Sequence, residues 1–384
     1  MRSVEELQRE RSQIRSDLLA GKKPKRLFIT PNFTMEAACG LAGVSLIEAH
    51  YNLELFEKAL AKVCETFYSD VFAPRSTRFA HVYQILGARN WILGSNGTIQ
   101  HPEIETMYTE DYDEFIADPY KTIMEKFLPR ACAAQNTDPI NNSLALANAY
   151  GAYKDIINVQ NGIAANMIAK YGYVPGFITN QMIEAPFDFL ADQLRGFKGI
   201  TMDIRRCPGK VKAAVEAITP LMIKMATPAA MRPGLISFIP LHLAPFINPK
   251  AFDELYWPTF ETMIVELDKK GIACSLFVEQ DWTRYCEYLE RLPKSTIMFM
   301  EGGDPKRFTE TVGKDHAFAG FYDPTITLAK SKQECIDEAK KLLDICMKSD
   351  HFYFNFDKNI IDIKSVDVPK LQAVLEWVHE NGIY

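Results

Sequence analysis

The sequence predicts a (β/α)8 TIM barrel with an N-terminal helical extension and a β-hairpin insertion, and three features support this fold class. Eight short apolar runs alternate with helix-length segments along the 384 residues, which is the pattern of a parallel sheet covered by helices. Polar residues follow most of these runs, as expected where strands end at the rim of a barrel. No G-x-G-x-x-G turn follows any run. The alternative, an open doubly wound sheet with a helical insert, is therefore weaker.

The alternation is clearest between residues 271 and 304. Two apolar runs, 272–278 and 296–300, each end in a carboxylate, Glu279 and Glu301. Ligands of parallel α/β sheets meet the carboxyl ends of the strands, so we expect Glu279, Asp281 and Glu301 to share one rim. The alternative is that these acids are helix caps or solvated loop charges.

The remaining elements follow the same rhythm. The other predicted strands are 26–30, 67–72, 173–178, 235–239, 317–321 and 352–356, and the main predicted helices are 53–67, 142–171, 187–194, 208–226, 248–269, and those that begin at 305, 331 and 369. No linker or low-complexity segment divides the chain, so we expect a single barrel domain over residues 1–384.

Two additions to the barrel are predicted from local signals. Ser3 and Glu6 have the spacing of a capping box, which indicates a helix over residues 4–20 within a leading segment 1–25. Asn96-Gly97 suits a type I′ turn between two apolar arms, which indicates a hairpin over residues 90–101.

Composition narrows the class of protein. The hydrophobic fraction is 47%, the charged fraction 24% and the net charge −6, which are values of a globular protein without a basic surface for nucleic acid. Eight cysteines without a CxxC pair predict reduced thiols. No uncharged apolar run reaches membrane length, and the charged N-terminus lacks an apolar signal core, so we expect a cytoplasmic protein without a membrane partner.

The predicted rim is rich in oxygen ligands. The polar residues at or just beyond the strand ends are Asn32, Asp70, Asn180, Gln181, His242, Glu279, Gln280, Asp281, Glu301, Tyr322, Asp323, Asn355 and Asp357. Such acids suit proton transfer or the binding of a divalent metal. The alternative for the lone histidine, His242, is a hydrogen-bonded structural role.

Three segments resemble the uroporphyrinogen decarboxylase superfamily, which also contains methyltransferases that act with corrinoid proteins. TFYSDVF (66–72) followed by QILG (84–87) is similar to the strand that carries the family's catalytic aspartate, which implies Asp70. MIEAPFDFLADQLRG (182–196) resembles its G-x-P-[WF]-T-L segment, and APFINPKAFDELYWPTF (244–260) resembles its S-P-x-x-F-x-x-F-x-x-P-Y element.

The departures from the decarboxylases bear on function. Their arginine-rich M-R-Q-A-G-R-Y segment corresponds to TPNFTMEAACG (30–40), which has no arginine, and their catalytic tyrosine falls on Asp192. A porphyrinogen with many carboxylates would lack its cationic clamp. The resemblance therefore implies that uroporphyrinogen is not the substrate.

The methyltransferase branch of the superfamily binds zinc with an H-x-C strand end and a later cysteine. Here Phe277 and Glu279 stand in place of the H-x-C residues, and the last strand offers no cysteine. A harder site from Glu279 and Glu301, with His242 or Asp357, is the predicted Zn²⁺ set. The alternative is a barrel without metal.

We therefore predict a methyltransferase that moves a methyl group between a small methylated ether or amine and a separate corrinoid protein, since the chain has no D-x-H-x-x-G cobalamin signature. The predicted catalytic residues are Asp70, Glu279, Asp281 and Glu301, and the predicted substrate-binding residues are Asn32, Asn180, Gln181, His242 and Tyr322. One alternative is a tetrapyrrole decarboxylase. Another is a barrel that binds a ligand without turnover.

Overall fold

The computed structural model describes residues 3–72 and 78–384. The chain divides into two compact units, and β4 (Ile272–Val278) begins in the second and continues into the first. Unit one comprises Met1–Thr77, Asn158–Thr179 and Ser275–Tyr384, and unit two comprises Arg78–Ile157 and Asn180–Cys274. The expectation of one domain stays a prediction.

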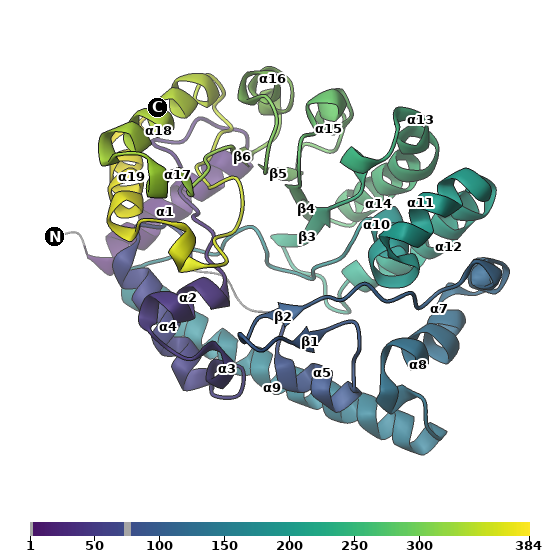
Figure 1. The fold of residues 1–384 in the computed structure, drawn as a ribbon. Coiled ribbons are helices and arrows are strands. Elements are labelled where there is room, and N and C mark those ends of the chain that lie inside the picture. Colours follow the sequence, from purple (N-terminus) through teal and green to yellow (C-terminus); the bar gives the residue numbers. More distant parts are fainter. Residues whose placement is uncertain (1–2, 73–77) are drawn as a thin grey trace. The chain divides into compact units, whose positions relative to one another are not determined.

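Unit one contains three regular parallel strands in the order β4-β5-β6, and Figure 1 shows them next to one another. β5 spans Ile297–Met300 and β6 spans Phe318–Gly320. Val278 is paired with Met300, and Met300 is paired with Gly320. The carboxyl ends of the three strands therefore meet at one edge, as the sequence predicted for Glu279 and Glu301.

Four more predicted strands of unit one lie beside this sheet through single bridges and hydrogen bonds. Residues 352–356 join β6 and residues 26–30 by parallel bridges (Phe318 with Phe352, Ile29 with Phe354). Asp70 N donates to Ile29 O, and a parallel bridge links Val71 to Val174. Segment 173–178 contains Pro175 and Gly176, which limit a regular ladder because proline has no N–H to donate.

Unit two contains β3 (Leu235–Leu241), which forms a parallel bridge from Phe238 to Met182. Ile183 N donates to Phe238 O at 3.0 Å. Residues 180–183 and β3 thus run side by side, and both segments are followed by polar residues, Glu184 and His242.

The predicted hairpin forms in unit two from β1 (Ile92–Leu93) and β2 (Ile99–Gln100). Its turn differs from the prediction. Gly97 N donates to Gly94 O, which places Ser95 and Asn96 at the centre, and Gly97 takes the positive φ of 86°. The loop between the paired residues is longer than the two-residue type I′ turn requires.

The helices fill the connections between these strands. In unit one they are α1 (Val4–Leu19), α2 (Met35–Ala42), α3 (Leu46–Ala49), α4 (Leu53–Thr66), α15 (Cys286–Glu290), α16 (Pro305–Glu310), α17 (Ile326–Ala329), α18 (Lys332–Cys346) and α19 (Val368–Asn381). In unit two they are α5 (Ala80–Leu86), α6 (Tyr112–Ala117), α7 (Pro119–Thr122), α8 (Leu128–Ala131), α10 (Pro186–Phe189), α11 (Gly196–Arg206), α12 (Pro208–Ala226), α13 (Pro249–Ala251) and α14 (Trp257–Lys269). Helix α9 (Pro139–Tyr171) runs from unit two into unit one.

Capping explains where two of the helices of unit one begin. Ser3 and Glu6 form the predicted capping box of α1, and Ser331 and Glu334 form a second capping box at the start of α18. Each box satisfies backbone N–H groups that have no partner inside the helix.

Figure 1 shows α2 and α4 side by side in the same unit.

Two predicted helices of unit two contain a π-helical turn. Residues Leu190–Arg195 join α10 to α11, and Phe252–Tyr256 join α13 to α14. A π turn inserts one residue into the α-helical repeat and is frequent at functional sites. The first of these turns carries Asp192 and Gln193.

None of the eight cysteines, all of which lie in the described ranges, forms a disulfide. Within the described ranges, no helix has both the length and the apolar character of a membrane span.

Candidate active site

Asp70 of unit one is fully buried, at 0% exposure, and is surrounded by donors. Its carboxylate accepts from Arg26 Nη1 at 2.8 Å and Nη2 at 3.0 Å, and from Arg11 Nε at 3.1 Å. Ile29 N and Tyr68 OH donate to it at 2.9 and 3.0 Å. Both oxygens are therefore engaged by fixed partners.

This network favours a structural role for Asp70. Burial lowers the pKa of Arg26. The hydrogen bond to Asp70 and the charge of Asp70 raise this pKa by more than burial lowers it, so that the net shift is upward. Burial and the charge of Asp70 raise the pKa of Tyr68. Because fixed donors engage both of its oxygens, Asp70 anchors the chain around Arg11 and Arg26. Its predicted catalytic role stays a prediction and is not used in the proposed mechanism.

The ends of β4 and β5 bring Glu301 against the chain that follows β4. Glu301 Oε2 accepts from Gln280 N at 2.7 Å, and Gln280 has the unusual positive φ of 63°. Asp281 is exposed, and its Oδ1 accepts from Thr283 N at 2.8 Å. Glu279 is half-buried at the end of β4. Glu301 thus contacts the backbone that follows the neighbouring strand, and Asp281 contacts the backbone two residues further on. The predicted catalytic roles of Glu279, Asp281 and Glu301 stay predictions.

Two predicted substrate-binding residues form internal contacts instead. Tyr322 is buried, and its OH donates to Cys335 O at 3.1 Å. Asn180 Nδ2 donates to Ala226 O at 2.7 Å and to Ser237 Oγ at 2.9 Å. These contacts anchor the chain, so neither residue enters the proposed mechanism.

Two others, Gln181 and Asn32, are positioned by hydrogen bonds of their backbones. Gln181 is exposed and its carbonyl accepts from Phe238 N, while Asn32 is half-buried and its carbonyl accepts from Ile360 N. Their roles as ligands of a substrate stay predictions.

The predicted zinc set is divided between the units, because His242 belongs to unit two and Glu279, Glu301 and Asp357 belong to unit one. Over the described ranges, no three His, Cys, Asp or Glu side chains form a group that could hold a metal ion. The predicted zinc ligands stay a prediction, and no step of the proposed mechanism uses zinc.

Unit two instead gathers a set of titratable side chains where residues 180–183 and β3 end. His242 Nδ1 lies 2.8 Å from Asp192 Oδ2. Glu184 Oε1 accepts from Gln193 Nε2 at 2.8 Å, and Glu184 Oε2 is buried without a hydrogen-bond partner among the described residues. The π turn places Asp192 and Gln193 toward their partners from successive positions.

Asp188 holds this arrangement together. Its carboxylate is fully buried and accepts from His242 N and Leu243 N, each at 3.0 Å, and from Tyr256 OH at 2.8 Å. These bonds tie the end of β3 to α10. Burial, followed by the charge of Asp192, raises the pKa of Asp188 to about 6.

Among these side chains, Glu184 has the pKa that best suits proton transfer near neutral pH. Burial raises its pKa to about 7, and the charges of Asp192 and Asp188 add to the rise, while His242 and the hydrogen bond from Gln193 oppose it. A carboxylic acid with this pKa is partly protonated at neutral pH. It is therefore suited to general acid–base catalysis.

The hairpin of unit two carries an aromatic stack. The rings of Trp91 and His101 are stacked with centroids 4.0 Å apart, and the guanidinium of Arg78 lies 4.3 Å from the centre of the Trp91 ring. Burial lowers the pKa of His101; the charge of Asp192 opposes this, and Arg78 and His242 add to it. His101 is thus within electrostatic reach of the Asp192–His242 pair.

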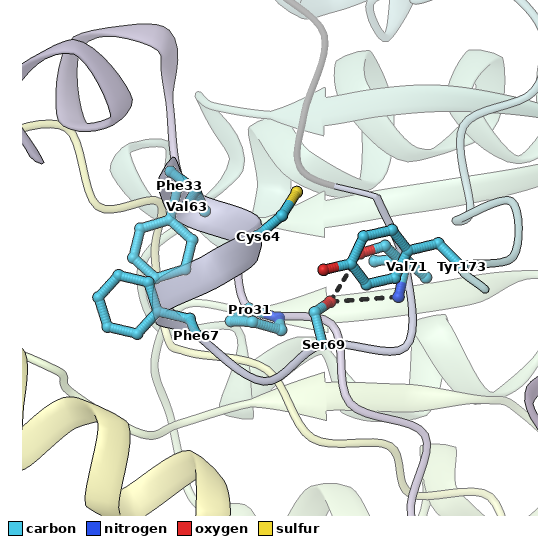
Figure 2. A pocket seen from close by; sticks show the side chains of 8 residues that line it. All are labelled: Pro31, Phe33, Val63, Cys64, Phe67, Ser69, Val71 and Tyr173. Carbon is cyan, nitrogen blue, oxygen red and sulfur yellow. Dashed lines mark hydrogen bonds between the residues drawn. The ribbon is translucent and has the colours of Figure 1, made fainter. Parts of the chain in front are cut away.

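A small pocket of unit one is distinct from these groups. Figure 2 shows Phe33, Phe67 and Tyr173 among its lining, with Ser69 beside Val71. Ser69 Oγ donates to Val71 O and accepts from Val71 N. Water-sized space amounts to about 10 Å³, which is room for one water molecule at most. We exclude this pocket as a substrate site.

Glu184, Asp188 and His101 were missed as candidates from the sequence, and Asp192 was noted only as the position of a missing tyrosine. One signal was available. Glu184, Asp188 and Asp192 recur at intervals of four residues within the segment that resembles the family motif, which gathers three acids in one short stretch.

Comparisons with known proteins agree with this architecture. The sequence model of the uroporphyrinogen decarboxylase (URO-D) family matches residues 178–381. Among solved structures, a methyltransferase from Methanosarcina mazei is similar with a TM-score of 0.60 and 13% identity, over 96% of this chain and 97% of that chain. No curated protein sequence matches significantly.

These matches define first a class of fold and then a family. The fold is a (β/α)8 TIM barrel, which confirms the fold class predicted from the sequence. The chain belongs to the uroporphyrinogen decarboxylase superfamily, as its sequence motifs indicated.

Proposed function

We propose that this protein is a methyltransferase that moves a methyl group from a small methylated ether or amine to a separate corrinoid protein. The single observation that carries the proposal is the buried acid Glu184 beside the Asp192–His242 pair, where two parallel segments of unit two end. The likeness to the methyltransferase from Methanosarcina mazei supports the reaction class.

A methyl group on oxygen is a poor electrophile because the leaving oxygen takes up negative charge. In our proposal Glu184 donates its proton to that oxygen while the C–O bond breaks and its electron pair stays on oxygen. The methyl group passes to the partner's reduced corrinoid, which supplies the nucleophile. Glu184 regains a proton from solvent. A methylated ammonium carries its positive charge already, so an amine donor depends less on this acid.

The neighbours of Glu184 keep the acid ready for this step. Gln193 donates to Oε1, so the proton sits preferentially on Oε2, the oxygen without a partner among the described residues. The negative charges of Asp192 and Asp188 favour the protonated form of Glu184. Asp188 fixes the backbone of His242 and therefore the place of the imidazole.

The proposal is tested by mixing the protein with cob(I)alamin, a corrinoid protein and a panel of methyl ethers and amines. We expect the methylcobalamin spectrum to appear with one of the donors. With an ether, Glu184→Gln lowers the rate by about 10²- to 10⁴-fold, the range of general acid catalysis. Glu216→Gln, on the exposed face of α12, is the matched control and keeps the rate.

Two outcomes would contradict the proposal. A full rate for Glu184→Gln would remove the acid from the mechanism. No methylcobalamin from any donor, with a corrinoid partner supplied, would instead favour a barrel that binds a ligand without turnover.

Tetrapyrrole decarboxylation is the weaker alternative. The charged groups that act on Glu184 are Asp188, Asp192 and His242, so a substrate with many carboxylates meets like charge there. We expect no coproporphyrin when uroporphyrinogen is incubated with the protein and the oxidised products are separated by chromatography. Its formation at an enzymatic rate would reverse the order of the two proposals.

A further inference from the structure

Asp357 of unit one is a buried carboxyl group with an incomplete set of partners. The residue is 8% exposed and follows the strand segment 352–356. Its Oδ1 is buried and has no hydrogen-bond partner among the described residues. Its Oδ2 lies 3.7 Å from Lys358 Nζ, whose side chain is 48% exposed. A buried carboxylate oxygen without a donor is costly.

Two more carboxylates act on Asp357 from neighbouring strand ends. Asp357 N donates to Tyr322 O at 2.8 Å, which places it beside the chain end that carries Asp323. Burial raises the pKa of Asp357 to about 7; the charge of Lys358 opposes the rise, and the charges of Asp323 and Glu301 add to it. Asp357 is thus within electrostatic reach of Asp323 and Glu301, which follow β6 and β5.

The backbone at this edge is strained. Phe321 has a φ of 69° and Gln280 a φ of 63°, both in the left-handed region. Such conformations cost about 1–3 kcal/mol each for residues other than glycine, and they cluster at ligand-binding sites. Gln280 N donates to Glu301, and Phe321 immediately precedes the loop of Asp323. Both residues therefore lie at the edge that carries Glu301 and Asp323.

The kind of ligand that could bind beside Asp357 follows from the groups that are missing there, a positive charge and a hydrogen-bond donor. A positive charge would offset the mutual repulsion of the carboxylates, and an N–H donor would satisfy Asp357 Oδ1. A metal ion needs several ligand atoms around one point, and the described His, Cys, Asp and Glu residues form no such group of three. An ammonium group needs only one acceptor for its N–H, and its charge is attracted by the other carboxylates at longer range.

We propose that Asp357 binds the protonated amino group of a small molecule, with Oδ1 accepting its N–H, and that the charges of Asp323 and Glu301 attract this cation. Asp323 Oδ1 accepts from Thr325, and Glu301 Oε2 accepts from Gln280 N. This inference goes beyond the proposed function, because binding requires neither a corrinoid protein nor transfer of a methyl group.

Titration calorimetry with trimethylammonium chloride tests the proposal. We expect saturable binding in the millimolar range, since so small a ligand has few atoms to contribute. Tetramethylammonium has the charge but no N–H, and tert-butanol has a donor but no charge. Both should bind at least about tenfold more weakly, which is the effect of losing a charge-assisted hydrogen bond.

Variants locate the binding. Asp357→Asn should weaken trimethylammonium at least about tenfold, whereas Asp344→Asn, on the exposed face of α18, should leave it unchanged. Thermal unfolding of both variants checks that they are folded. Equal affinity for trimethylammonium and tetramethylammonium, or full affinity in Asp357→Asn, would overturn the proposal. So would the absence of saturable binding. Because this assay contains no methyl acceptor, its failure is distinguishable from failure of the methyl-transfer proposal.

Discussion

Asp70 and Asp357 are both buried aspartates of unit one that belong to strand segments, yet their surroundings are opposite. Asp70 accepts hydrogen bonds from two arginines, one tyrosine and one backbone N–H. Asp357 has one oxygen without a partner in the described chain and a single lysine 3.7 Å from the other. The same residue type is a structural anchor in the first place and an unsatisfied acceptor in the second. The hydrogen-bond partners of a buried aspartate, rather than its position at a strand, therefore determine which of these roles it has.

The strongest test of this contrast is Asp70→Asn. The variant leaves the buried guanidinium groups of Arg11 and Arg26 without their counter-charge. Removing one partner of a buried ion pair costs about 3–5 kcal/mol. We expect the free energy of unfolding in urea to fall by about that amount. A loss below about 1 kcal/mol, the value of an exposed ion pair, would show that the network is not a structural anchor.

The opposite sign is expected for Asp357→Asn. The pKa of Asp357 in the folded protein, about 7, lies above the value of about 3.9 in an unfolded chain. The folded state therefore binds more protons between these values, and wild-type stability falls as pH rises from about 4 to about 7. Asparagine cannot ionise and avoids this loss.

The measurement is urea unfolding of wild type and Asp357→Asn at low and high pH. We expect the variant to be more stable by about 1–3 kcal/mol at pH values above 7 and nearly equal to wild type at about pH 4. Destabilisation of the variant at high pH would mean that the Asp357 carboxylate has a strong partner in the folded protein.

The smallest effect concerns the affinity for trimethylammonium. Protonation of Asp357 competes with the bound cation, so affinity should fall as pH decreases below about 7, by up to about tenfold per pH unit. Lys358 is the nearby group of opposite charge, and Asp323 and Glu301 are the nearby acids. Calorimetry at several pH values measures the slope. An affinity for trimethylammonium that stays constant between about pH 5 and 8 would show that binding does not depend on the Asp357 carboxylate.

The sequence predicts much of the fold because its signals are local. The capping boxes at Ser3 and Ser331, the hairpin and the strands around Glu279 and Glu301 all depend on residues a few positions apart. The predicted turn type of the hairpin was wrong, because the length of the loop rather than the Asn96-Gly97 pair determined the geometry of the turn.

The candidate site was less predictable because its contacts are distant in sequence. Asp70 is separated by 59 residues from Arg11 and by 44 from Arg26, so its engagement could not be read from the strand that carries it. Asp192 meets His242 through a π turn, which a search for α-helical periodicity does not detect. The burial that raises the pKa of Glu184 likewise depends on the tertiary structure.

The central claim is that Glu184 acts as the acid in methyl transfer, and the pH dependence of the single-turnover rate tests it most directly. With a methyl ether and a reduced corrinoid protein in excess, the rate constant should be highest below about pH 7, the pKa of Glu184. Above that pH it should fall by about tenfold per unit as the acid loses its proton. In Glu184→Gln the rate should be low and lack this decrease. A wild-type rate that rises through the same pH range, or the same decrease in Glu184→Gln, would contradict the account.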